Sequence, residues 1–189
     1  MPSLTRTATL SDTFDFVMAF AGSSTISSYV KPAISQAVQG IGVDKKCSIW
    51  ETIVRLVAGD TSLLETNNVV LIYRERGEQV QCRQIGLHCP PIRVWGFEFA
   101  ACGNHECRPS PYDFCIRENE SGVRMVCRRC NWRSASLRLR DAEGMISRVN
   151  STVPNVYWHE YPPSTRSQDL FVRVTKRKEG ASVSATTRP

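Results

Sequence analysis

Apolar residues recur at helical spacing along the first third of the chain. Ser11 has the residue type of an N-cap, and the apolar positions of Phe14–Ala21 then follow at i, i+3, i+4 and i+7. A second apolar stripe runs through Ile26–Val38 and is expected to end at Gly40 and Gly42. These two patterns predict two helices, each with one face in a hydrophobic core.

A third helix is the most clearly marked of the three. Ser48 and Glu51 have the spacing of a capping box in front of an apolar stripe, and Gly59 follows that stripe. From about Asn67 the period changes to the alternation typical of strands, with a hairpin turn predicted at residues 76–78. The expected strands are Val69–Tyr73, Gln79–Ile85, Arg93–Ala101, Leu137–Arg140, Val156–Tyr161 and Leu170–Val174.

Together these patterns predict an α+β protein. A short helical N-terminal part, residues 1–66, packs on a mainly antiparallel β-sheet with a zinc ribbon-like insertion. The β-rich domain spans residues 67–175 and contains the insertion at residues 102–130, and the basic, polar segment 176–189 is expected to be disordered. No apolar run approaches the ~20 residues that span a bilayer, and no secretory signal pattern opens the chain. We therefore expect an intracellular protein, cytoplasmic or nuclear, that does not contact a membrane.

Four of the eight cysteines have the spacing of zinc ligands. Cys102 and Cys107 are separated from the C-x2-C pair Cys127 and Cys130 by nineteen residues. This spacing resembles that of zinc ribbons and related treble-clef folds, in which two short loops each present two sulfurs to one tetrahedral ion. The resemblance covers residues 102–130 and implies a structural zinc site. His105 lies at a C-x2-H position and is an alternative ligand to Cys107.

The remaining cysteines and the known catalytic motifs add no second site. Cys47, Cys82 and Cys89 are interpreted as small apolar residues. Cys115 is a further substitute ligand for the zinc site, although its place in a strand-like stretch favours a core position. Zinc nucleobase deaminases need H-x-E and then P-C-x-x-C, whereas here Glu106 follows its histidine directly. The H-E-x-x-H, phosphate-loop and dinucleotide motifs do not occur in the sequence. We therefore expect that the protein is not an enzyme.

The excess of positive over negative charge lies entirely in the second half of the chain. The net charge is +6, yet residues 1–100 carry nine basic and nine acidic side chains, and arginines outnumber lysines nineteen to five. Guanidinium groups suit phosphate, which indicates nucleic acid as the partner. The predicted nucleic-acid-binding residues are Arg124, Arg128, Arg129, Trp132, Arg133, Arg138 and Arg140.

Arg138 and Arg140 are expected on one face of a strand. Two alternatives stay open. Trp132 either stacks on a base or shields the metal. The whole region also fits a module that binds another protein, in which zinc is purely structural and the arginines meet carboxylates.

Overall fold

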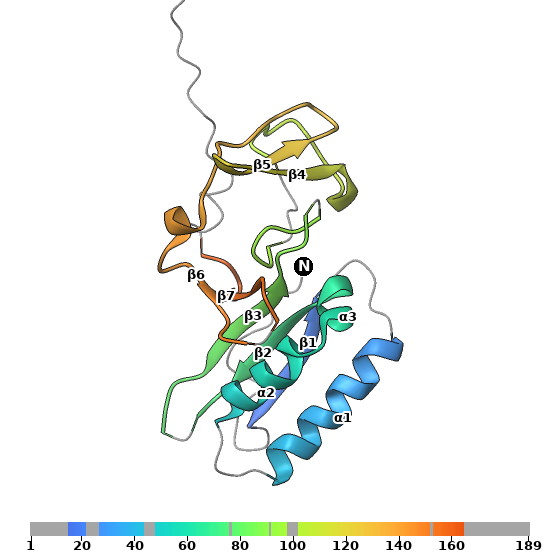
Figure 1. Ribbon diagram of the computed structural model, residues 1–189, viewed down its shortest axis with the longest axis vertical. Coiled ribbons are helices and arrows are strands. Elements are labelled where there is room, and N and C mark those ends of the chain that lie inside the picture. Colours follow the sequence, from blue (N-terminus) through green and yellow to red (C-terminus); the bar gives the residue numbers. More distant parts are fainter. Residues whose placement is uncertain are drawn as a thin grey trace, which may run out of the picture.

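The structure, a computed structural model, has the mixed α+β architecture that the sequence predicts, and it describes residues 15–21, 27–43, 48–75, 77–90, 92–97, 102–151 and 153–164. Five strands form an antiparallel sheet in the order β1-β2-β3-β7-β6, and two more form a separate hairpin (Figure 1). The sheet strands are β1 Phe16–Ala21, β2 Asn68–Tyr73, β3 Gln81–Leu87, β6 Ile146–Arg148 and β7 Val156–Glu160. The hairpin strands are β4 Phe114–Asn119 and β5 Gly122–Cys127, and the helices are α1 Ser27–Val43, α2 Ile49–Ala58 and α3 Thr61–Thr66.

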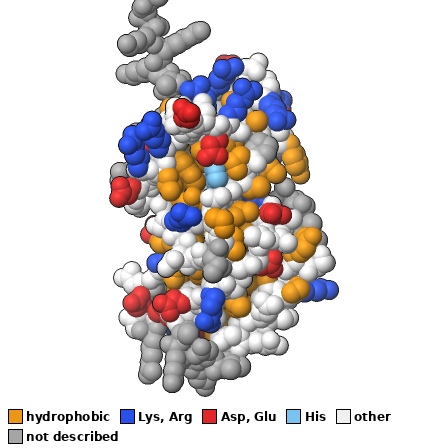
Figure 2. Space-filling view, in the orientation of Figure 1, with side chains coloured by type: hydrophobic (Ala, Val, Ile, Leu, Met, Phe, Trp, Pro, Cys, Tyr) orange, Lys and Arg blue, Asp and Glu red, His pale blue; other side chains and the backbone are white. Residues whose placement is uncertain are grey.

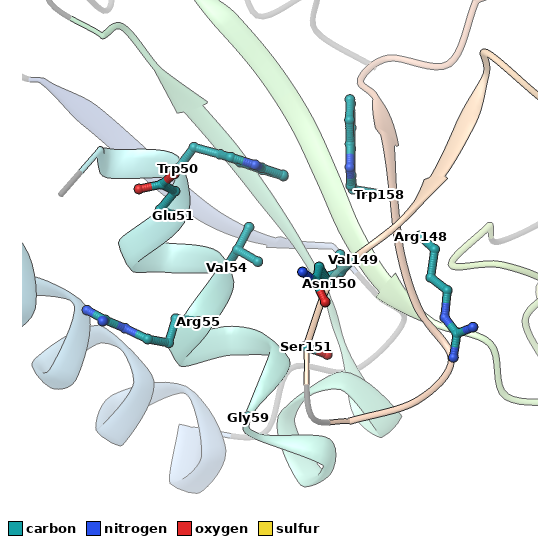
Figure 3. A pocket seen from close by; sticks show the side chains of 10 residues that line it. All are labelled: Trp50, Glu51, Val54, Arg55, Gly59, Arg148, Val149, Asn150, Ser151 and Trp158. Carbon is teal, nitrogen blue, oxygen red and sulfur yellow. The ribbon is translucent and has the colours of Figure 1, made fainter.

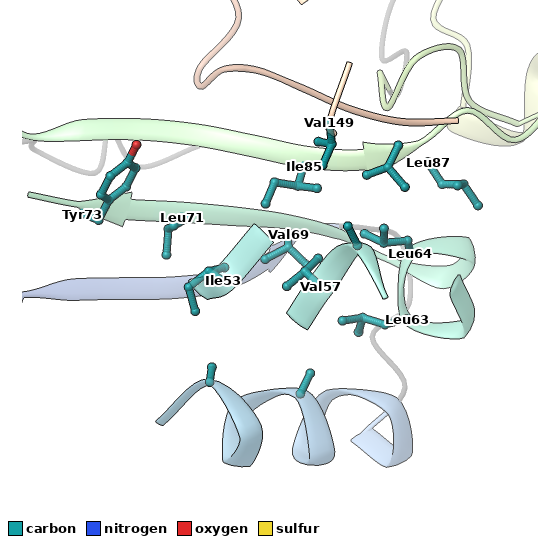
Figure 4. Packing of buried hydrophobic residues seen from close by; sticks show 14 residues of the cluster. Ile53, Val57, Leu63, Leu64, Val69, Leu71, Tyr73, Ile85, Leu87 and Val149 are labelled. Atoms are coloured by element: carbon teal, nitrogen blue, oxygen red, sulfur yellow. The ribbon is translucent and has the colours of Figure 1, made fainter. Parts of the chain in front are cut away.

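Helix α2 connects the helices to the sheet. The N-cap half of its predicted capping box is confirmed, because the Ser48 hydroxyl accepts a hydrogen bond of 3.0 Å from the Glu51 backbone N–H. Ile53 and Val57, four residues apart, are buried against strand residues such as Leu71 (Figure 4). Burying each such side chain contributes about 1.5–3 kcal/mol, so this stripe holds the helix to the sheet.

Helix α1 lies outside α2 and forms the outermost layer (Figures 1 and 4). The helix was expected to end at Gly40 and Gly42, and it continues through both glycines to Val43. A Cβ at Gly40 would lie 3.2 Å from Thr52 Cγ2 of α2. The glycine is therefore explained by the close approach of two helices rather than by a helix end.

The helix predicted over Phe14–Ala21 is wrong: its described part is strand β1. Phe16, Met18 and Phe20 alternate along the chain, and all three pack against the main hydrophobic core. The same apolar residues satisfy a period of 2 as well as a period near 3.6, and pairing with β2 decides between them. Residues 11–14 lie outside the described residues.

The strand predicted over Arg93–Ala101 is also wrong. Residues 93–97 form a tight turn closed by isolated bridges, with φ of 49° at Trp95 and 79° at Gly96. Gly96 lies directly on Gly86 of β3, where an added Cβ at Gly86 would lie 2.7 Å from the Gly96 Cα. The turn therefore covers the face of the sheet opposite α2, and residues 98–101 lie outside the described residues.

The strand predicted over Leu137–Arg140 is only partly present. Leu137 bridges Val123, but a 3-10 helix begins at Leu139. The Asp141 carboxylate accepts a 2.7 Å hydrogen bond from the Arg138 backbone N–H and starts that helix. Arg138 and Arg140 therefore do not share a strand face. The predicted strand over residues 170–174 and the tail 176–189 lie outside the described residues.

Residues 88–155 form an insertion between two neighbouring strands of the sheet, β3 and β7. This insertion carries the β4–β5 hairpin, whose second strand ends at Cys127, the first cysteine of the second pair. Its residues Ile116 and Val123 pack with Tyr157 of β7 in a second hydrophobic core, and a smaller core lies around Phe114 and Met125. Figure 1 shows the hairpin at the end of the molecule opposite α1.

Candidate metal centre

Four cysteine sulfurs converge at the base of the hairpin. The sulfurs of Cys102, Cys107, Cys127 and Cys130 all lie within 4.8 Å of one another. Two of the separations are 3.7 Å, between Cys102 and Cys130, and 3.9 Å, between Cys107 and Cys127. A tetrahedral ion with Zn–S bonds of ~2.3 Å has S···S edges of about 3.8 Å, and a disulfide would need ~2.05 Å. The group could therefore hold a metal ion.

The second cysteine pair is positioned by the end of β5. Cys127 is the last residue of the strand, and its N–H donates to the Trp132 carbonyl at 2.9 Å, which folds the chain back after Cys130. Asn131 adopts a positive φ of 59°, which asparagine tolerates better than most residues. The result is a tight knuckle whose sulfurs face the same point.

The first pair lies on a short turn after residue 101. The Cys107 N–H donates to the Asn104 carbonyl at 3.0 Å, and the Asn104 side chain accepts from the Glu106 N–H at 3.1 Å. This closed turn brings Cys107 back towards Cys102. His105 lies on the exposed outside of the same turn, and its ring is not part of the sulfur group.

Trp132 covers the centre. A Cβ at Gly103 would lie 2.6 Å from the Trp132 Nε1, so only a glycine allows the indole this close. The ring packs against the small core that contains Cys102 and Cys127. This position favours the shielding role of Trp132 over a free surface for base stacking.

The sulfur environment controls the acidity of the thiols. Burial, followed by contacts with the other thiols, raises the pKa of Cys107 to about 12, and burial raises the pKa of Cys102. The Trp132 backbone N–H bonds to the Cys130 sulfur and lowers the pKa of Cys130 to about 7. Because the thiolate is the metal ligand, a divalent cation would bind here by displacing protons.

The other cysteines do not join the centre. Cys115 is half-buried on β4, outside the sulfur group, and Cys89 packs against the main core. Cys82 is half-buried on β3. Cys47 lies outside the described residues.

Arginines gather on the outer face of the hairpin. Arg124 of β5 pairs directly with Arg117 of β4, and Arg133 bridges Val126 on the other side of β5. Residues opposite one another in an antiparallel pair point to the same face, which puts these three arginines together. Figure 2 shows Lys and Arg side chains concentrated at this end of the molecule.

The knuckle and the 3-10 helix carry the other predicted arginines. Arg128 and Arg129 are exposed between the two cysteines of the second pair, and an Arg129 Nη1–H donates to the Arg108 carbonyl at 2.7 Å. Arg138 and Arg140 are exposed at the start of the 3-10 helix. The arginines therefore surround the hairpin instead of forming one row.

Two nearby carboxylates, those of Glu118 and Asp113, have other hydrogen-bond partners. Glu118 lies on the inner face of the hairpin, and its Oε2 is 3.4 Å from Nε2 of His88. The other ring nitrogen of His88, Nδ1, accepts a hydrogen bond from the Trp95 N–H. The Asp113 carboxylate accepts from the Ser110 N–H and hydroxyl, and these bonds lower its pKa. Among the described residues, no carboxylate forms an ion pair with an outer-face arginine.

Arg117 and an exposed tyrosine, Tyr112, are missing from the residues predicted from sequence. Arg117 could have been found from the hairpin register, since the turn at Asn119–Gly122 places it opposite Arg124. Tyr112 is 75% exposed just before β4, and its position follows only from the fold.

A separate hollow lies between α2 and residues 148–151, and none of the four cysteines of the metal centre lines it. It has a volume of about 510 Å³, and Trp50 and Trp158 form part of its wall (Figure 3). Arg55 and Arg148 point away from one another at its two sides, so these two charges do not converge on a common ligand position.

Comparison with known proteins does not identify a relative. No protein-family model, curated protein or solved structure matches the chain. No helix in the described part of the chain is long and apolar enough to cross a membrane. Function therefore has to be argued from the residues themselves.

Proposed function

We propose that the protein is a non-catalytic zinc-binding protein whose arginine-rich hairpin binds nucleic acid. Zinc is the best match to the centre because four soft sulfur ligands with tetrahedral separations are its usual structural environment. Catalytic zinc keeps a coordination position open for water or substrate, whereas four cysteines fill all positions. The ion would therefore hold the two cysteine segments together and fix the surface around them.

The pairing of Arg117 with Arg124 carries the nucleic-acid proposal. Like charges directly opposite one another on a sheet are destabilising, by up to about 1 kcal/mol. No described carboxylate forms an ion pair with either arginine, and Arg133 adds a third positive charge to the same face. A chain of phosphates would neutralise all three guanidinium groups with charge-assisted hydrogen bonds.

The metal is tested first, by its content in protein purified without added metal and without a histidine tag. We expect about one zinc ion per chain, with four sulfur ligands in the X-ray absorption spectrum. Removal by a chelator should unfold the hairpin region. A metal-free protein with intact hairpin structure would contradict the zinc proposal.

Nucleic-acid binding is tested by titrating labelled oligonucleotides at several salt concentrations. Binding through phosphates should weaken steeply with salt, with a log–log slope of about −0.7 to −0.9 for each neutralised phosphate. Arg117→Gln with Arg124→Gln should reduce that slope by about 1.5. The matched control is Arg55→Gln with Arg148→Gln, which removes the same charge from exposed sites elsewhere in the fold.

These results distinguish a nucleic-acid partner from a protein partner. If the control pair weakens binding as much as the hairpin pair, the effect is one of net charge and the hairpin face is not the site. If the protein binds no oligonucleotide and instead binds another protein with little salt dependence, the interaction-module alternative is correct.

A further inference from the structure

Tyr112 is the most exposed of the described large hydrophobic side chains. It is 75% accessible, compared with 38% for Tyr29 on α1. An exposed tyrosine offers an apolar ring face together with a polar hydroxyl, and for this reason tyrosine is enriched at binding interfaces.

The backbone at Tyr112 is held rigidly against the knuckle. Asp113 donates its N–H to the Ser110 carbonyl at 3.0 Å, and the Asp113 side chain accepts from the Ser110 N–H at 2.7 Å. The Asp113 carbonyl accepts from the Arg128 N–H at 2.7 Å. The position of Tyr112 is therefore fixed relative to the arginines between Cys127 and Cys130.

Two arginines of the knuckle are hydrogen-bonded to the segment that carries this tyrosine. Arg128 is exposed on the knuckle, one hydrogen bond away from the residue that follows Tyr112. Arg129 uses one N–H on the carbonyl of Arg108, four residues before Tyr112. Each guanidinium has five N–H donors, so most remain available for a phosphate.

We infer that the knuckle binds single-stranded nucleic acid, with Tyr112 stacking on an unpaired base and Arg128 and Arg129 contacting the flanking phosphates. This inference rests on the proposed function and specifies its substrate class. An exposed aromatic ring on a segment that is hydrogen-bonded to arginines supplies the two kinds of group, a stacking face and cationic donors, that single-strand-binding surfaces use. In a duplex the base faces are covered by neighbouring bases, so the ring gains nothing there.

Base stacking was one of the two roles predicted for Trp132, and here it is assigned to Tyr112 instead. That indole is packed on Gly103 and belongs to the small core beneath the cysteines. Trp132 therefore supports the knuckle from within, and Tyr112 presents the aromatic surface to the ligand.

The test compares the zinc-loaded full chain with three single variants, Tyr112→Ala, Tyr112→Phe and Tyr29→Ala. Their affinities are measured by fluorescence anisotropy for a single strand of about 20 nucleotides, as DNA and as RNA, and for the matching DNA duplex. We expect Tyr112→Ala to weaken single-strand binding about tenfold or more and leave duplex binding unchanged. Tyr112→Phe keeps the stacking ring and should retain affinity, and Tyr29→Ala removes a distant exposed tyrosine as control.

Salt dependence distinguishes stacking from phosphate contact. Tyr112→Ala should lower single-strand affinity equally at all salt concentrations, whereas Arg128→Ala with Arg129→Ala should reduce the log–log slope by about 1.4. Unchanged single-strand affinity in Tyr112→Ala, or equal losses on strand and duplex, would overturn the inference while leaving the proposed function intact. If the wild-type chain binds neither strand nor duplex, both proposals fail.

Discussion

Replacing Cys127 by serine is the sharpest test of the metal centre. Cys127 is fully buried at the end of β5, and its sulfur lies 3.9 Å from that of Cys107. Serine keeps the size of the side chain but replaces a thiolate ligand with a hydroxyl that binds zinc poorly. The change therefore removes one ligand with minimal disturbance of the packing.

The expected loss follows from the strength of structural zinc sites. Such sites bind with an apparent free energy of ~10–16 kcal/mol at pH 7, so one of four equal ligands accounts for about 2.5–4 kcal/mol. This loss corresponds to roughly a hundredfold to a thousandfold weaker zinc affinity. The buried hydroxyl of serine adds about 1–3 kcal/mol of destabilisation if it finds no partner.

Competition against a chromophoric zinc chelator measures this affinity directly. Cys115→Ser is the matched control, because Cys115 lies on the neighbouring strand of the same hairpin and outside the sulfur group. We expect the control to bind zinc as tightly as the wild type. Equal affinities for Cys127→Ser and the wild type, or equal losses in both variants, would refute the assignment of the ligands.

Three further predictions concern the five-stranded sheet and the residues packed on it. Arg93→Ala should lower the free energy of unfolding in urea by about 3–5 kcal/mol, because this buried guanidinium donates to two carbonyls at the end of α3 and to Asn68. Burial lowers the pKa of His159 below 6.5, so the unfolded state binds its proton first. The free energy that the neutral, buried His159 contributes should be fully present above about pH 6.5 and should decrease as the pH falls below that value. Between about pH 7 and 5, the His159→Gln variant should therefore lose less stability than the wild type. Gly86→Ala should cost about 2 kcal/mol in thermal unfolding, because its Cβ would overlap Gly96; a neutral effect would contradict that packing.

The fold class and the cysteine spacing could be predicted because both depend on local signals. The Ser48 N-cap and the C-x2-C knuckle are decided by residues within four positions of one another. The β4–β5 hairpin follows in the same way from a turn between two extended runs. In these segments the local preference and the tertiary fold agree.

Other segments depend on partners distant in sequence. The alternation of Phe16, Met18 and Phe20 becomes a strand only because β2, some fifty residues later, offers an edge for pairing. The aromatic alternation of residues 95–99 predicts a strand, yet Gly86 allows the chain to turn directly onto the sheet. Tyr112 belongs to the knuckle surface through a hydrogen bond between Asp113 and Arg128, which no sequence period indicates.

The nesting of the cysteine centre between β3 and β7 has a consequence for synthesis on the ribosome. All four cysteines precede residue 131, whereas β7, which lies between β3 and β6 in the sheet, starts only at Val156. Metal can therefore load onto the nascent chain while the sheet is still missing its fourth and fifth strands. Contacts close in sequence form faster than distant ones, so the β4–β5 hairpin should form before β7 pairs with β3 and completes the sheet.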